Sequence, residues 1–283
     1  MGLIKTFVLM LGLMLLFMFV GQLLGGEEGM RTAFWIAVAL NMYSYFFSDT
    51  MVLKHYKATQ VKESDNSVVY PIVKRLAEQA KLPMPKVYVV PDKVPNAFAT
   101  GRNPSHAAVA VNQGLLDALS EEEIEGVLAH EMSHVKHRDI LISSVAAVFA
   151  GAISMLANMF RVNSATQQNS NRRTNSLGVL VGVILMPIAA AVIQMSISRT
   201  REYAADEGAA RLTRHPEWLM SALSKLEDYA KKYQMKNATS QTAHMFIVNP
   251  FSGVNQAMAA IFSTHPSTAS RIERLAKLKK ELS

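Results

Sequence analysis

The chain has 283 residues, of which 50% are hydrophobic and only 18% are charged, and this balance is too apolar for a typical soluble protein. It contains no cysteine, so disulfide scaffolds and thiolate metal sites are excluded. The net charge of +7 comes from basic residues spread along the chain, which suits loop charges near anionic lipid better than a nucleic-acid surface.

Four apolar stretches approach the ~20 residues that a membrane-spanning helix needs. They cover residues 6–24, 32 to about 48, 140–160 and 177–198. The first is too long for the apolar part of a signal peptide and the second follows it at once, so we interpret it as a membrane segment. The fourth contains Pro187, which a membrane helix tolerates with a kink.

The charges that flank these segments predict their orientation. The connection at residues 25–31 is acidic on balance, whereas lysines lie on the other side of the first two segments. By the positive-inside rule, the N-terminus and residues 49–139 and 199–283 are expected in the cytoplasm. The loop at residues 161–176 would then face outward although it carries arginines, so segments three and four could instead form a shallower hairpin.

The first soluble stretch shows signs of mixed α/β structure. Residues 65–81 predict an amphipathic helix, and short strands are expected at residues 86–90, 96–101 and 107–111. A capping box that starts at Ser120 predicts the beginning of a further helix.

That helix carries the pentapeptide His-Glu-Met-Ser-His at residues 130–134. An HExxH sequence on a helix places two imidazoles one turn apart on one face, which is the separation that one Zn²⁺ needs, and leaves Glu131 free to act on water as a general base. No proline interrupts the chain before Phe160, so the helix is expected to run on into the third apolar segment and the site to lie at the membrane surface.

A catalytic zinc ion needs a third protein ligand besides His130 and His134. The protease class with the pattern HExxHxxGxxH is excluded, because the glycine and the third histidine are missing. Glu202 follows the fourth apolar segment at a matching depth, so it is the predicted third ligand of one zinc per chain. Asp206, one turn further, is expected to orient a ligand imidazole. His137 is the competing ligand.

Several motifs together carry a resemblance to a known family. They are HEMSH preceded by Val-Leu-Ala, REYAAD at residues 201–206, NAFATG at residues 96–101, and Thr264-His265-Pro266 followed by Arg271-Ile272. With these motifs the chain resembles the HtpX heat-shock membrane metalloproteases, relatives of the CAAX prenyl endoproteases, over essentially its whole length.

The resemblance implies a zinc-dependent, multi-pass endopeptidase of the bacterial inner membrane with a cytoplasmic active site. It also implies a role in stress response and protein quality control, in which damaged or misfolded membrane proteins are cut. The family pattern places His265 as a catalytic donor to the developing carbonyl charge and Arg271 as a supporting residue nearby.

A peptide substrate must bind in an extended form, and an edge strand can hold it through backbone hydrogen bonds with little sequence specificity. Weak specificity would suit unfolded or damaged proteins as partners. The strand residues that we predict to bind substrate are Asn96, Ala97, Phe98, Ala108 and Val109.

The expected fold is a mainly α integral membrane protein with a small β-sheet. Residues 1–50 form a transmembrane hairpin, residues 51–139 a protease block with the HExxH helix, residues 140–198 the third and fourth segments, and residues 199–283 a second protease block. Residues 232–255 show no strong periodicity and are expected to gate the site.

Two other interpretations stay open. The chain could be a soluble-type zinc peptidase that one hairpin anchors, with residues 140–198 folded as core helices. It could also be a membrane scaffold whose zinc is structural and closed by a fourth ligand such as His137. A transporter is a weaker option, because the apolar segments carry almost no ionisable residues that would mark an ion path.

Overall fold

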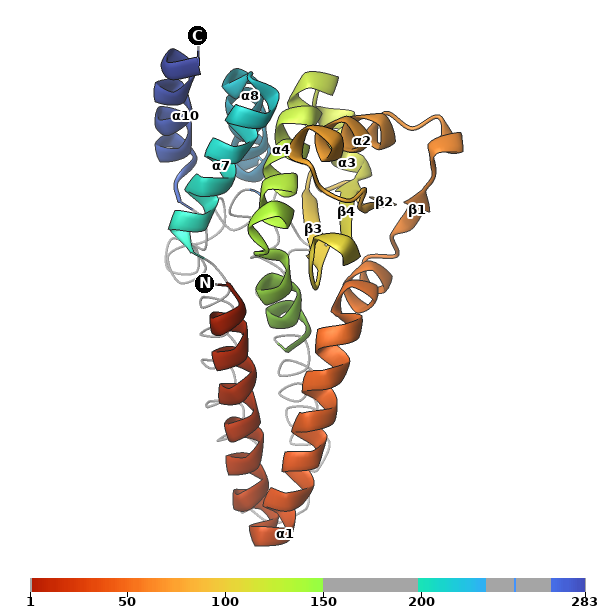
Figure 1. Cartoon of the computed structure of the whole chain (residues 1–283), viewed down its shortest axis with the longest axis vertical. Coiled ribbons are helices and arrows are strands. Elements are labelled where there is room, and N and C mark those ends of the chain that lie inside the picture. Colours follow the sequence, from red (N-terminus) through yellow and green to blue (C-terminus); the bar gives the residue numbers. More distant parts are fainter. Residues whose placement is uncertain (1, 150–197, 233–246, 248–265, 283) are drawn as a thin grey trace.

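A long bent helix and a helical head built on a small sheet make up the computed structural model of the chain (Figure 1). The structure describes residues 2–149, 198–232, 247 and 266–282. The head holds the sheet and the shorter helices, and the bent helix extends away from it.

The bent helix, α1 (Gly2–His55), leaves helical geometry only at Gly25 and Gly26. Gly26 has φ +59°, a conformation that glycine adopts without steric cost, so two residues suffice to reverse the chain. The predicted loop at residues 25–31 was therefore too long. The two arms, Thr6–Leu23 and Gly25–His55, are each long and apolar enough to cross a membrane.

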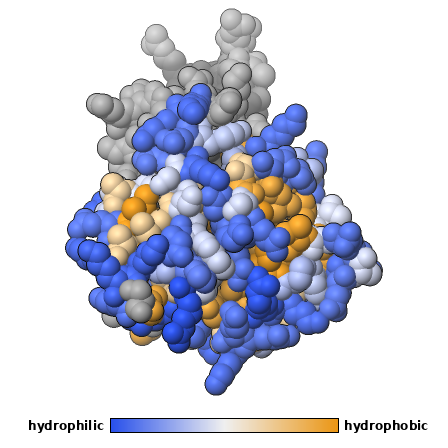
Figure 2. Space-filling model, turned by 90° about the horizontal axis from the view of Figure 1, so that it is seen from above, coloured by the Kyte–Doolittle hydropathy of each residue, from blue (hydrophilic) through white to orange (hydrophobic). Residues whose placement is uncertain are grey.

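Large apolar side chains are exposed mainly on this helix. Among the described residues, the exposed large apolar side chains lie on α1 with the exceptions of Val68 and Met84. The face of the head opposite the bend is instead dominated by hydrophilic side chains (Figure 2). An apolar belt of this extent is typical of a surface that meets lipid or another protein.

Within the described residues, the sheet has four strands in the order β1-β2-β4-β3, with β2 and β4 parallel and the other pairs antiparallel. The expected strands are confirmed, and a short first strand was missed. Of these strands, β3 lies at an edge and β4 in the interior. The strands are β1 (Thr59–Val61), β2 (Lys86–Val90), β3 (Ala97–Gly101) and β4 (Ala107–Asn112).

One helix, α4 (Glu121–His137), runs through the centre of the head and packs against the sheet and three other helices. Its apolar side chains Val127, Leu128 and Met132 are fully buried in the main core. The surrounding helices are α2 (Val69–Ala80), α3 (Gln113–Ala118), α7 (Arg199–Thr213), α8 (Pro216–Lys232) and α10 (Thr268–Leu282).

The HExxH helix does not run on into the third apolar segment, contrary to the prediction. It ends at His137, and Arg138 takes a left-handed conformation with φ +60°. The Arg138 N–H then bonds to the carbonyls of His134 and Val135, which closes the helix. A separate apolar helix, Ile140–Phe149, begins after Asp139.

The two arms of α1 pack against different parts of the molecule. Leu9 and Leu13 of the first arm pack against the Ile140–Phe149 helix. Val52 and Leu53 at the end of the second arm pack on the sheet. The fourth apolar segment, the polar loop at residues 161–176 and the proposed gate lie outside the described residues, apart from Ser198, Lys232 and Ile247.

Candidate metal centre

The capping box fixes the start of the helix that carries the HExxH sequence. The Glu123 carboxylate accepts the Ser120 N–H at 2.8 Å, and the Ser120 hydroxyl accepts the Glu123 N–H at 3.4 Å. Lys225 and Ser221 of α8 both bond to the same carboxylate. The helix is therefore anchored to its neighbour at the end far from the histidines.

A glycine allows α7 to approach α4 closely. A Cβ added at Gly208 would lie 2.5 Å from the Ser133 hydroxyl oxygen, a distance that side chains do not tolerate. This close packing brings Glu202, in the first turn of α7, to the level of the two histidines.

His130, His134 and Glu202 form a group that could hold a metal ion. The two Nε2 atoms are 3.2 Å apart, and each lies 3.6 Å from a Glu202 carboxylate oxygen. His130 and Glu202 are buried and His134 is partly exposed. One ligand atom from each of the three residues therefore lies within 4.8 Å of the other two.

Glu131 lies beside this group and is almost fully buried. Its Oε2 accepts the backbone N–H of Ala99 on strand β3 at 2.9 Å. Burial raises the pKa of the Glu131 carboxyl, although the charges of His130 and His134 oppose the shift. A raised pKa makes the carboxylate a better proton acceptor.

A carboxylate and a guanidinium support His130 from behind. Asp206 lies 2.9 Å from His130 Nδ1, and Arg271 binds both carboxylate oxygens of Asp206 at 2.6 and 2.8 Å. Burial alone would raise the pKa of Asp206, but Arg271 and His130 lower it to about 2. Burial opposes protonation of His130, yet its bonds to Asp206 and Glu202 raise its pKa to about 9.

A second carboxylate supports His134, and sequence reasoning missed it. Asp139 Oδ2 lies 3.3 Å from His134 Nδ1, and its Oδ1 lies 3.4 Å from Arg201 Nη1. The signal was present, since an aspartate directly before an apolar run is a helix-start pattern. The signal was overlooked because residues 120–160 were expected to form one continuous helix.

The competing ligand His137 is not part of the metal group in the described residues. His137 is exposed and lies by Ser133 and Gly208 at a hollow between α4 and α7, with a volume of 430 Å³. His265 lies outside the described residues. Arg271, by contrast, reaches the site and lies 3.4 Å from His130 Nδ1.

The predicted substrate-binding strands differ in what they offer. β4 lies between β2 and β3, so Ala108 and Val109 have no free edge, and their assignment to edge pairing is wrong. Phe98 turns its ring toward the opposite sheet face, where it lies 5.2 Å from the ring of Tyr56. Ala97 and Ala99 are buried on the side of α4.

Asn96, just before β3, contacts a distant part of the chain. Its Oδ1 accepts the Ile247 N–H at 3.2 Å, and the Ile247 carbonyl accepts a bond from Arg271 at 2.9 Å. The start of the edge strand is therefore linked to the guanidinium behind His130.

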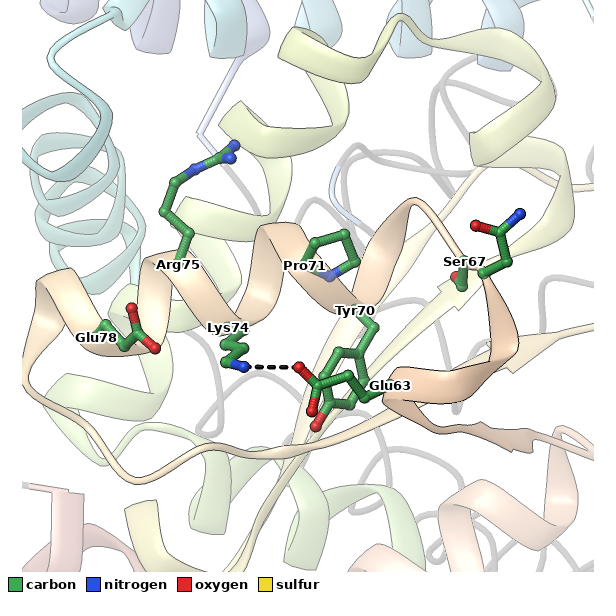
Figure 3. Close-up of a pocket in the computed structure, with 8 residues that line it drawn as sticks. Glu63, Ser67, Tyr70, Pro71, Lys74, Arg75 and Glu78 are labelled. Carbon is green, nitrogen blue, oxygen red and sulfur yellow. Dashed lines mark hydrogen bonds and ion pairs between the residues drawn. The ribbon is translucent and has the colours of Figure 1, made fainter.

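A further hollow on the outer side of α2 has a different character (Figure 3). Lys74 and Glu63 form an ion pair there at 2.7 Å, while Arg75, which also lines the hollow, points away from this pair. Arg75 instead pairs with Glu125 of α4. This hollow brings opposite charges together and does not bring together a metal-binding group.

Known proteins share both the sequence and the fold. The model of peptidase family M48 matches residues 63–279. Curated proteins described as "Protease HtpX homolog" are similar over nearly the whole chain. The one from Campylobacter hominis is 61% identical over 99% of this chain and 99% of its own length. The one from Campylobacter concisus is 56% identical over 100% and 99%, and that from Pyrococcus furiosus is 48% identical over 99% and 96%.

A solved structure described as S. mikatae Ste24p matches with a TM-score of 0.53 at 18% identity, which shows a shared fold. The match covers 96% of this chain, which spans 65% of that structure's chain. By the family match and the full-length relatives, the chain belongs to peptidase family M48 and, within it, to the HtpX protease homologues.

Proposed function

We propose that this chain is a membrane-anchored zinc endopeptidase in which His130, His134 and Glu202 hold the metal ion and Glu131 is the general base. The observation that carries the proposal is that one ligand atom from each of the three residues lies within 4.8 Å of the other two, beside a buried carboxylate.

The ligand set fits zinc. A tetrahedral ion with nitrogen and oxygen ligands at about 2.0–2.2 Å needs its ligand atoms roughly 3.3–3.6 Å apart. The two imidazole nitrogens are 3.2 Å apart, and each lies 3.6 Å from a different oxygen of the Glu202 carboxylate. Two imidazoles and one carboxylate are a donor set of catalytic zinc sites, which keep one position open for water. A structural site would need a fourth protein ligand, and within the described residues the group comprises His130, His134 and Glu202 without exposed His137.

Zinc in such a site supplies a Lewis acid that acidifies water and polarises the scissile carbonyl. Glu131 takes the proton of the attacking water and delivers it to the leaving amine. The Ala99 N–H holds one oxygen of Glu131, which aims the carboxylate. His265 is the proposed hydrogen-bond donor to the carbonyl oxygen as negative charge develops there.

Edge strand β3 supports the choice of substrate class. It lies against the HExxH helix, and extended peptides add to such edges through backbone bonds that read little side-chain identity. We propose unfolded or damaged proteins, especially membrane proteins, as substrates, with β3 and Asn96, Ala97 and Phe98 at the start of the binding groove.

The two membrane-length arms of α1 and the lysines beside them support a multi-pass protein of the bacterial inner membrane with its site in the cytoplasm. A role in stress response and protein quality control accords with a site that needs little sequence specificity.

The test is cleavage of casein, as an unfolded protein, by the full chain purified in detergent. Wild type, Glu131→Gln and a chelator-treated sample are compared, with the zinc content of each measured. We expect cleavage by the untreated wild type alone, and about one zinc per chain in both wild type and Glu131→Gln.

Two outcomes would contradict the proposal. Cleavage by Glu131→Gln at the wild-type rate would remove Glu131 as the base. Zinc that stays bound while no form cleaves casein or a membrane-protein substrate would favour the structural-site interpretation.

A further inference from the structure

The short break after α4 brings one residue back onto the metal-binding helix. Arg138 leaves the helix in a left-handed conformation, and the Asp139 N–H then bonds to the His134 carbonyl at 3.0 Å. The Asp139 carboxylate meanwhile reaches the imidazole of the same histidine. Backbone and side chain of Asp139 therefore both contact His134.

The carboxylate of Asp139 lies between a ligand and a cation. It is 6% exposed, with Oδ2 3.3 Å from His134 Nδ1 and Oδ1 3.4 Å from Arg201 Nη1. Arg201 directly precedes the third ligand, Glu202, in the first turn of α7. The contact therefore joins the end of the HExxH helix to the segment that supplies the third ligand.

We propose that Asp139 is a positioning residue for His134, and that Arg201 holds Asp139 in place. This inference rests on the proposed metal site. When Nδ1 carries the proton and donates it to Asp139, Nε2 keeps its lone pair directed at Glu202 and His130, where a metal ion would bind. Asp139 thus fixes both the tautomer and the orientation of the ring.

A purely structural role for Asp139 makes different predictions. Asp139 precedes the Ile140–Phe149 helix, where aspartate is a favoured N-cap. Asparagine and serine are comparably good N-caps. Asp139→Asn and Asp139→Ser should therefore preserve the start of the apolar helix. The asparagine variant removes the negative charge. The serine variant removes the charge and also has a side chain too short to contact His134.

The experiment measures zinc affinity by chelator competition with the full chain in detergent. Loss of a carboxylate behind a ligand histidine typically weakens metal binding ~10–100-fold, so we expect a loss in that range for Asp139→Ser and a smaller one for Asp139→Asn. Arg201→Gln should weaken binding less, and Arg201→Lys should restore part of the loss. The absorption spectrum of the cobalt-loaded protein should change in Asp139→Ser, because the ligand geometry changes.

Asp117→Asn is the matched control. Asp117 accepts a hydrogen bond from Gln113 on the exposed face of α3, so its replacement should leave zinc affinity and the cobalt spectrum unchanged. Thermal unfolding of the metal-free chains shows whether a variant is simply damaged, and we expect the Asp139→Asn and Arg201→Gln chains to unfold close to wild type.

The outcomes separate this inference from the proposed function. If wild type binds zinc and cleaves casein, and both Asp139 variants bind zinc as tightly as wild type, Asp139 has no positioning role. If wild type binds no zinc at His130, His134 and Glu202, both proposals fall together.

Discussion

The two histidines of the candidate metal group receive the same kind of support from very different parts of the molecule. Behind His130, Asp206 and Arg271 come from distant helices, are buried, and are joined by contacts of 2.6–2.9 Å. Behind His134, the carboxylate lies five residues along the chain, and its contacts are 3.3 and 3.4 Å. The first support is part of the core, whereas the second depends on one local turn.

The two carboxylates therefore differ in how much each contributes to the stability of the fold and to the proposed metal binding. Arg271 also bonds to the Ile247 carbonyl, so the support of His130 holds α4, α7 and α10 together. The support of His134 adds little to the core but lies where the head meets the Ile140–Phe149 helix. Changes behind His130 should therefore damage both the fold and the proposed metal binding, whereas changes behind His134 should affect mainly the proposed metal binding.

The largest effect is expected from Arg271→Leu. It leaves the buried Asp206 carboxylate without its cation, and breaking a buried pair in this way costs about 3–5 kcal/mol of unfolding free energy. Thermal or denaturant unfolding in detergent measures the loss. Arg211→Leu is the control, because its partner Glu207 is a surface residue and exposed pairs contribute under about 1 kcal/mol. Equal stability of the two variants would show that the buried network is not structural.

Next in size is the effect of Asp206→Asn on the metal. We expect zinc affinity to fall by ~10–100-fold, because the carboxylate behind His130 sets its tautomer and basicity. The loss should exceed that of Asp139→Asn, since the contact with His130 is shorter and more buried. A larger loss of zinc affinity in Asp139→Asn than in Asp206→Asn would show that His134 depends more on its carboxylate than His130 does.

A pH titration should show proton competition at His130. Its pKa is raised to about 9, so a proton competes with the metal for His130 Nε2 below that pH. Zinc affinity should then rise with pH by up to about tenfold per unit until pH 9. Asp206, with a pKa of about 2, stays charged throughout this range. Chelator competition between pH 6 and 9 measures the slope, and a flat profile would contradict the prediction.

The smallest effect is expected from Ser120→Ala at the opposite end of α4. Loss of the capping box should lower the unfolding free energy by about 1 kcal/mol. Zinc affinity should stay at the wild-type value, because the cap lies more than two turns from the histidines. The variant thus measures whether a loss of stability at the start of α4 by itself lowers zinc affinity. A clear drop in zinc affinity would contradict this prediction.

Local patterns predicted much of the site. The capping box, strands β2–β4 and the positions of His130, His134, Glu202 and Asp206 all followed from spacing or charge along short stretches. Such features depend on a few neighbouring residues, and the structure places these residues together. The match of Glu202 to the histidines also required an assumption about how two apolar segments pack.

Features that depend on tertiary packing were not predictable in the same way. The helix break at Arg138 is set by one left-handed residue, which a run without proline or glycine does not reveal. The contact of Asn96 with Ile247 joins residues 151 apart. Nor could the pattern of small residues at 107–111 show that this strand lies inside the sheet.

The bend at Gly25 and Gly26 has a consequence for how the protein can be dissected. One arm of α1 packs against the Ile140–Phe149 helix, and the other packs against the sheet face that carries Phe98. The hairpin therefore covers apolar surfaces of the rest of the protein besides offering two membrane-length helices. Deletion of the hairpin would expose apolar side chains of the Ile140–Phe149 helix and of the sheet. We therefore expect the truncated protein to aggregate rather than to behave as a soluble peptidase.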